Sequence, residues 1–164
     1  RRAPDLQDVE ASQSLIVTAS RLARPGAQRP RQADLRRAVS TAYYALFHAL
    51  AKNSADMLVG TGRTRPDKAW AQVYRSLNHG DARAACESAR NLGFPETVKA
   101  CADAFVQLQQ ERHNADYDPH HRIRRADALD AIALAESAMA NLRAAPRRDR
   151  LAFAVQIHFK RRRS

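Results

Sequence analysis

The sequence predicts an all-α protein that forms one helical domain around a single hydrophobic core. The chain has 164 residues, a length that suits one domain. Hydrophobic residues make up 45% of it, enough for a sizeable interior. Alanine and arginine, which both favour helices, recur throughout, whereas glycine occurs five times and proline seven times. This composition fits a helical bundle better than a sheet protein.

Apolar residues at helical spacing and the positions of helix breakers divide the chain into successive helices. We expect a first helix over residues 5–24, with Asp5 as its N-cap, and a second over residues 34–52, with Asp34 as its N-cap. Further helices are predicted over residues 67–78, 81–91, 95–115 and 122–144. Loops rich in glycine and proline are predicted over residues 24–31 and 60–66.

The second helix has the clearest pattern, and we expect it to be the central helix of the bundle. One face carries apolar residues three or four positions apart, namely Leu35, Val39, Ala42, Leu46 and Leu50. Tyr43, Tyr44 and Phe47 widen that face until little polar surface remains. A helix of this kind is buried on most sides.

The end of the chain has a different pattern, so we divide the sequence into a helical bundle, residues 5–145, and a basic tail, residues 146–164. Apolar residues alternate strictly with other residues from Leu151 to Phe159, which is the period of a strand. A single strand needs a partner strand from elsewhere. The tail is therefore predicted to be extended, with a short amphipathic helix as the competing interpretation.

The charge balance indicates a polyanionic partner. Lysine and arginine number 28 against 17 acidic residues, a formal charge of +11. A field of this sign attracts polyanions and steers them toward the protein. Charge alone does not distinguish RNA from DNA or from an acidic protein, and a solvated basic surface is the alternative interpretation.

Membrane and disulfide-stabilised classes are excluded by the pattern of residues. No stretch of 18 apolar residues is present, so we expect no transmembrane helix and no membrane partner. No hydrophobic segment follows the first residues as it would in a signal peptide, and we expect a cytoplasmic protein. Cys86 and Cys101 lie in alanine-rich helical sequence and are expected to be buried free thiols.

The densest run of polar residues lies between Glu111 and His121. Arg112 and Asp116 are four residues apart, so on a helix they share a face within reach of a salt bridge. RNA cleavage needs a group that takes the 2′-hydroxyl proton, a cation for the phosphorane charge and an acid for the leaving oxygen. We therefore predict a catalytic set that consists of Arg112, His113, Asp116, Tyr117 and His120.

Each member of this set has an expected role. Arg112 would hold the phosphate, because its planar guanidinium matches phosphate oxygens, and Asp116 would orient Arg112. His113 or His120 would transfer the proton, and Tyr117 would stack or form a hydrogen bond. The structural alternative is that Arg112 and Asp116 are an ion pair that fixes the helix end, since such pairs imitate active sites.

A metal site is a further interpretation of the same run. Five side chains are potential ligands, namely His113, Asp116, Asp118, His120 and His121. No pair among them has a recognised zinc spacing, and we expect neither a metal nor another cofactor.

A second set of polar residues is predicted to bind RNA. Arg37, Ser40, Tyr44 and His48 follow one another along one face of the central helix. If this helix packs beside residues 95–115, they meet Arg112 across the bundle. The alternative is that Tyr43 and Tyr44 are core aromatics with satisfied hydroxyls. The end of the tail adds four cations to the predicted RNA-binding set, Lys160, Arg161, Arg162 and Arg163.

Two segments together resemble a known family. Residues 36–48, RRAVSTAYYALFH, are similar to the signature helix of the HEPN superfamily (higher eukaryotes and prokaryotes nucleotide-binding domain), whose usual form is Arg, several residues, then Tyr-Tyr-Ala-x-Phe. Residues 112–118, RHNADYD, resemble the later element of one prokaryotic branch, in which Arg precedes Ala-Asp-Tyr.

The resemblance implies a four- to five-helix up-and-down bundle that forms a homodimer. It also implies a metal-independent ribonuclease of a toxin–antitoxin or phage-defence module, with a nucleotidyltransferase as antitoxin. The family's catalytic pattern is Arg, four to six residues, then His. Here His120 follows Arg112 after seven residues, and His113 is adjacent to Arg112 and would face elsewhere on a helix.

Three functional hypotheses follow from the sequence. The first is an RNA-binding, HEPN-like protein that cleaves RNA without a metal. The second, favoured by the position of His120, is a non-catalytic helical module that pairs with a nucleotidyltransferase or another defence protein, with the tail strand added to that partner's sheet. The third is a DNA-associated protein that uses its basic tail alone, without a recognised DNA-binding motif.

Overall fold

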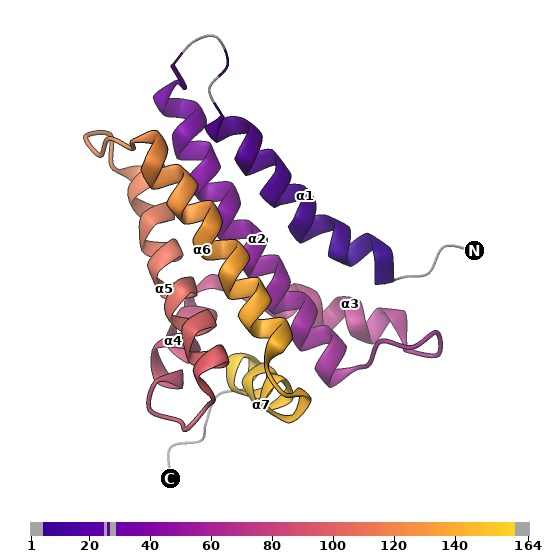
Figure 1. Cartoon of the computed structure of the whole chain (residues 1–164). Helices are drawn as coiled ribbons and strands as arrows, with labels where there is room; N and C mark the ends of the chain where they lie inside the picture. Colours follow the sequence, from indigo (N-terminus) through magenta and orange to yellow (C-terminus); the bar gives the residue numbers. More distant parts are fainter. Residues whose placement is uncertain (1–4, 25, 27–28, 160–164) are drawn as a thin grey trace.

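The fold is all-helical, as predicted. The computed structural model describes residues 5–24, 26 and 29–159, and for residues 5–10 it describes the backbone alone. The described residues form seven helices and no strand: α1 (Asp5–Ala23), α2 (Gln32–Leu58), α3 (Asp67–Ser76), α4 (His79–Ala89), α5 (Glu96–Tyr117), α6 (Arg125–Ala144) and α7 (Arg147–His158). In Figure 1 the long helices α1, α2, α5 and α6 run beside one another, and the short helices α3, α4 and α7 gather at one end.

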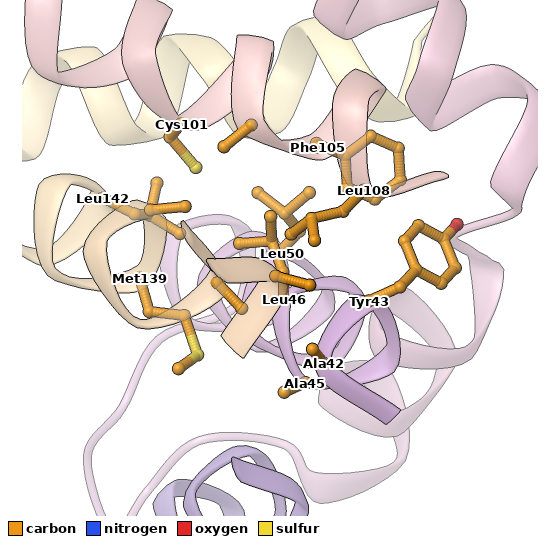
Figure 2. Packing of buried hydrophobic residues seen from close by; sticks show 14 of the residues in the cluster. Ala42, Tyr43, Ala45, Leu46, Leu50, Cys101, Phe105, Leu108, Met139 and Leu142 are labelled. Carbon is orange, nitrogen blue, oxygen red and sulfur yellow. The ribbon is translucent and has the colours of Figure 1, made fainter. Parts of the chain in front are cut away.

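Helix α2 is the central element, which confirms its predicted role. It packs against α1, α3, α5, α6 and α7. Figure 2 shows Leu46 and Leu50 of α2 among side chains of α5 and α6. Tyr43, Phe105 and Leu108 are each completely buried in the same cluster. A helix buried in this way needs apolar residues on most of its faces, and the sequence of α2 has them.

The predicted bounds of α2 were too narrow. The helix begins at Gln32 and not at Asp34, because the Gln32 amide exchanges hydrogen bonds with the backbone of Ile123, at 2.7 and 3.0 Å. The N-cap is Arg31, so the prediction that Asp34 caps this helix is wrong. Asp34 lies in the first turn, where its negative charge still favours the helix N-terminus. The predicted cap at Asp5 falls on a side chain outside the described ones.

The prediction of four to five helices undercounts the described part of the chain, which has seven. The predicted helices near residues 67–78 and 81–91 are present as α3 and α4. Relative to the six helices predicted from apolar spacing, the additional element is α7, which covers most of the predicted tail.

The prediction of an extended tail is wrong over its described residues, and the competing amphipathic helix is right. Alternation places Phe153 and Ile157 four residues apart, which also puts them on one face of a helix. Both side chains and Ala154 are buried, while Val155 and Phe159 are exposed. The core offers this face an apolar surface, whereas no strand exists in the described residues to pair with an extended segment.

The buried cysteines and the helix lengths agree with the sequence. Cys86 and Cys101 are free, buried thiols, and burial raises the pKa of Cys101 to about 12. Among the described helices, none has both the length and the apolar character that crossing a membrane requires.

Replacing Phe153 with alanine should destabilise the protein by about 3–5 kcal/mol, because a completely buried phenyl ring is lost and a cavity remains. The matched control is Val155→Ala on the same helix, where the side chain is 43% exposed. We expect that control to change stability by about 0.5 kcal/mol or less. Urea denaturation measures both, and equal effects would show that α7 does not pack on the core in solution.

Candidate functional site

A polar groove lies on the surface between the first half of α2 and the end of α5. Arg36, Arg37, Ser40, Tyr44 and Asp116 line it. The residues of α2 come three or four positions apart and therefore share one helix face. Packing of α2 against α5 thus brings Arg37, Ser40 and Tyr44 to the segment that contains Asp116.

Asp116 links the two helices through both oxygens of its carboxylate. The Arg112 Nε lies 3.1 Å from Oδ2, the salt bridge that the spacing predicted. The Ser40 hydroxyl donates to Oδ1. Because one partner lies on α5 and the other on α2, Asp116 fixes the orientation of Arg112 relative to the central helix.

The guanidinium of Arg112 rests on two aromatic rings. Its Cζ lies 5.5 Å from the ring centre of Tyr43 and 5.4 Å from that of Tyr44, both within cation–π range. The side chain is 17% exposed. Burial lowers the pKa of Arg112, but Tyr44 and Asp116 raise it more strongly, so its pKa lies above the ordinary value and the group stays charged.

The terminal nitrogens of Arg112 form no hydrogen bond with any residue that the structure describes. Asp116 engages only Nε, and the tyrosine rings contact the face of the guanidinium. Two parallel donors in the guanidinium plane thus remain for a ligand, and this geometry matches a phosphate or a carboxylate.

Arg36 shapes the groove from the other side. It donates to the backbone carbonyls of Ala115, at 2.7 Å, and Asp118, at 2.9 Å, and also to those of Pro119 and His121. These carbonyls belong to the end of α5 and the loop after it, where a cation is favourable. Arg36 therefore holds the segment around Asp116 in place.

A histidine that the sequence analysis missed lies close to this site. His79, the first residue of α4, has its Nδ1 2.6 Å from the Tyr43 hydroxyl. Its ring stacks on Phe47, with 4.2 Å between ring centres. Gln109 donates to both the Tyr43 hydroxyl, at 3.3 Å, and the His79 carbonyl, at 2.9 Å.

His79 and Arg112 lie against the same two tyrosines. The His79 ring centre is 5.6 Å from that of Tyr43 and 5.9 Å from that of Tyr44. Burial lowers the pKa of His79, and the positive charge of Arg112 lowers it further. A neutral imidazole at neutral pH can accept a proton, which is the property of a general base. His79 belongs to no motif in the sequence. The one signal that could have indicated it is Tyr43, because a buried tyrosine hydroxyl needs a hydrogen-bond partner.

Tyr43 and His48 of α2 do not line the groove. The Tyr43 hydroxyl is satisfied by His79 and Gln109, and burial raises its pKa to about 12. His48 lies against α3 instead of the groove, with Nδ1 2.6 Å from the Tyr74 hydroxyl. Burial lowers the pKa of His48.

His113, Tyr117 and His120 are exposed around the end of α5. The rings of His113 and Tyr117 lie against each other, with centres 5.0 Å apart, and Tyr117 is 65% exposed. Neither His113 nor His120 forms a side-chain hydrogen bond with Arg112 or Asp116 among the described contacts. The structure therefore places them beside the groove without joining them to its polar network.

The other predicted ligands and cations are placed as follows. The Asp118 carboxylate accepts from the backbone of His120, at 2.9 Å, and of His121, at 3.3 Å, so it organises the loop. Over the described ranges, no three His, Cys, Asp or Glu side chains gather as a metal site would require. The predicted RNA-binding cations Lys160, Arg161, Arg162 and Arg163 lie outside the described residues.

Positive charge surrounds the groove at one end of the bundle. Figure 1 shows the α1–α2 loop and the α5–α6 loop at the same end, where α2 begins and α5 ends. Arg21, Arg24, Arg29 and Arg31 line a hollow between α1 and α2. The α5–α6 connection adds the exposed Arg122 and Arg124. This end of the molecule therefore presents a field that attracts polyanions.

Comparison of the chain with protein-family models, with curated proteins and with solved structures found no match.

Acidification should destabilise the protein through its buried histidines. Folding lowers the pKa of His79 and His48 below the usual value of 6.5. Between the lowered pKa and 6.5 the unfolded chain binds more protons, so this stability is fully present above about pH 6.5 and is lost as the pH falls. Thermal unfolding at about pH 7 and pH 5 measures the loss.

The variant His79→Gln should lose less stability than the wild type between the two pH values. His113→Gln, which removes an exposed imidazole, is the matched control and should follow the wild type. An unchanged pH dependence in His79→Gln would show that the His79 imidazole is not held neutral by the fold.

Proposed function

We propose that this protein is an RNA-binding, HEPN-like helical protein in which Arg112 anchors an RNA phosphate. The observation that carries the proposal is the state of Arg112. Its Nε is fixed by Asp116, its face rests on two tyrosines, and its terminal nitrogens have no hydrogen-bond partner in the described structure. A cation oriented this way is preorganised for a bidentate phosphate contact.

The two segments that resemble the HEPN family contact each other in the structure, and this supports the proposed family. Residues 36–48 lie on α2 and residues 112–118 lie at the end of α5, far apart in sequence. Ser40 bonds to Asp116, and Arg112 contacts Tyr43 and Tyr44, so each segment completes the other. The four long helices packed along one another are what such a bundle requires.

The surroundings of Arg112 favour a single-stranded nucleic acid. Arginines from the α1–α2 and α5–α6 loops extend positive charge beyond the groove, where a phosphate backbone would continue. The exposed Tyr117, beside His113, offers a face on which an unpaired base can stack. RNA is preferred to DNA in this proposal because the polar groove offers hydroxyl and carboxylate groups to a 2′-hydroxyl.

We further propose that the site cleaves RNA without a metal and that His79, not His113 or His120, is the general base. The neutral His79 imidazole takes the proton of the 2′-hydroxyl, and the 2′-oxygen attacks the phosphorus. Arg112 stabilises the phosphorane charge. The 5′-oxygen leaves and takes a proton from water, which gives a 2′,3′-cyclic phosphate and a 5′-hydroxyl.

The resemblance adds the biological setting of the proposal. Proteins of this kind form homodimers and act as toxins or in phage defence beside a nucleotidyltransferase antitoxin. We propose the same arrangement here, and light scattering of the purified protein measures the oligomeric state.

Removal of the Arg112 guanidinium should weaken RNA binding by about 10- to 150-fold, the loss of a charge-assisted hydrogen bond worth about 1.5–3 kcal/mol. Fluorescence anisotropy with a single-stranded RNA measures this for Arg112→Gln. The slope of log K against log salt should also fall by about 0.7 for the lost phosphate contact. Arg90→Gln, which changes an exposed arginine directly after α4, is the control. Equal losses in both variants would mean that only the net charge matters.

Cleavage is tested with the same RNA in the presence of EDTA. The wild type should produce 2′,3′-cyclic phosphate ends, and His79→Gln should slow the reaction by about 10²- to 10⁴-fold. His113→Gln and His120→Gln are the matched histidine controls and should keep nearly full activity. If either control loses activity while His79→Gln stays active, the histidine altered in that control is the general base, and the assignment to His79 is wrong.

The second candidate function is a non-catalytic helical module that pairs with a nucleotidyltransferase or another defence protein. The observation in its favour is that His113 and His120 form no hydrogen bond with the Arg112–Asp116 pair in the described structure. Strand addition by the tail no longer supports it, because residues 147–158 are helical. RNA binding without cleavage by the wild type would favour this candidate.

A further inference from the structure

A second candidate site lies away from the groove, in a cavity lined by residues of α1, α2, α6 and α7. Its volume is about 160 Å³. The α2 residues that line it begin at Ala49, nine positions after Ser40, which corresponds to about 14 Å along a helix. The cavity is therefore separate from the Arg112 site, although both use the central helix.

The acidic side of the cavity is already neutralised. The Asp56 carboxylate is 6% exposed and pairs with Lys52. It also accepts from the Trp70 indole at 2.9 Å, and Arg65 lies 3.9 Å away. Lys52 and Arg65 balance its charge, so Asp56 is committed to the junction of α2 and α3.

Two arginines that line the cavity have no acidic partner in the described part of the chain. Arg150 donates from Nε to the buried Asn53 amide oxygen at 2.9 Å. The Asn53 nitrogen donates in turn to the Arg150 carbonyl at 3.4 Å. These contacts fix the guanidinium and leave its terminal nitrogens without a hydrogen bond among the described residues. Arg143 of α6 adds a second unpaired cation to the lining.

The remaining wall is apolar apart from the Ser12 hydroxyl and the Gln13 amide. Met139 and Leu142 of α6 and Ala49 of α2 supply the apolar surface. Ser12 of α1 also lines the cavity and is 7% exposed. Its hydroxyl can donate a hydrogen bond to a bound molecule.

We propose that this cavity binds a small organic carboxylate with a compact apolar body. The carboxylate pairs with the fixed fork of Arg150, assisted by Arg143, and accepts a hydrogen bond from Ser12. The apolar body packs on Met139 and Leu142. A cavity of this size holds a body about as large as one benzene ring, because a cavity of roughly 150 Å³ is known to accept benzene.

Such a ligand would contact residues of four helices, α1, α2, α6 and α7. A molecule that binds the folded state alone stabilises it by RT ln(1 + L/Kd), where L is the free ligand concentration, so the unfolding temperature rises with ligand concentration. The proposal does not depend on RNA binding or cleavage, since none of the cavity residues belongs to the groove.

Thermal unfolding and calorimetry with benzoate as the probe test the proposal on the full chain. Benzoate should raise the unfolding temperature and bind measurably. Benzyl alcohol, which lacks the charge, and inorganic phosphate, which lacks the apolar body, should each bind at least tenfold more weakly. No benzoate binding, or phosphate binding as strong as that of benzoate, would overturn the proposal.

Two variants locate the binding. Arg150→Gln should weaken benzoate at least tenfold, whereas Arg147→Gln, at an exposed position on the same helix, should leave it unchanged. Ala49→Leu keeps every polar group and fills the cavity, so it should also abolish binding, which keeps the test valid if Arg150→Gln fails to fold. Equal affinity in Arg150→Gln and Arg147→Gln, or undiminished binding by Ala49→Leu, would place the benzoate elsewhere.

Discussion

The burial of α2 is the constraint on which the rest of the structure depends. Five of the other described helices pack against it, and about half of its positions are buried. Alanines at Ala38, Ala42 and Ala45 have no exposed surface, and their small side chains let the neighbouring helices approach closely. A buried polar group on α2 is stabilised by a partner, because an unsatisfied one costs about 1–3 kcal/mol. Asn53 and Asp56 have such partners, whereas the buried Ser54 hydroxyl has none among the described residues.

Both candidate sites follow from this requirement. At the beginning of α2, Ser40 finds its partner in Asp116 of α5, and that contact fixes Arg112. Farther along, Asn53 finds its partner in Arg150 of α7. In each place a polar contact holds an arginine through its Nε and leaves the outer nitrogens to a ligand. The groove is open and has positive charge beside it, which suits a polymer, whereas the cavity is more recessed and partly apolar, which suits a small molecule.

The polar side chains at the groove fall into two groups, those that position other residues and those proposed to act on RNA. Arg36 and Asp116 hold the end of α5 through hydrogen bonds to the protein itself. Arg112 and His79 contact the same tyrosine pair and keep polar atoms that the described structure leaves unbonded. The proposed chemistry therefore rests on these two side chains, with the tyrosines as their common support.

Local spacing determined much of this protein from the sequence alone: the helical class, the central position of α2, the Arg112–Asp116 pair and the row of Arg37, Ser40 and Tyr44. These features depend on residues three or four positions apart, and a helix brings such residues together whatever surrounds it. The tertiary structure alone decided the rest. The alternation from Leu151 to Phe159 fits a strand or a helix face, and only the apolar surface of the core selects the helix for Phe153 and Ile157. His79 and Arg150 carry no local signal, because their partners Tyr43 and Asn53 lie far away in the chain and meet them only when the helices pack.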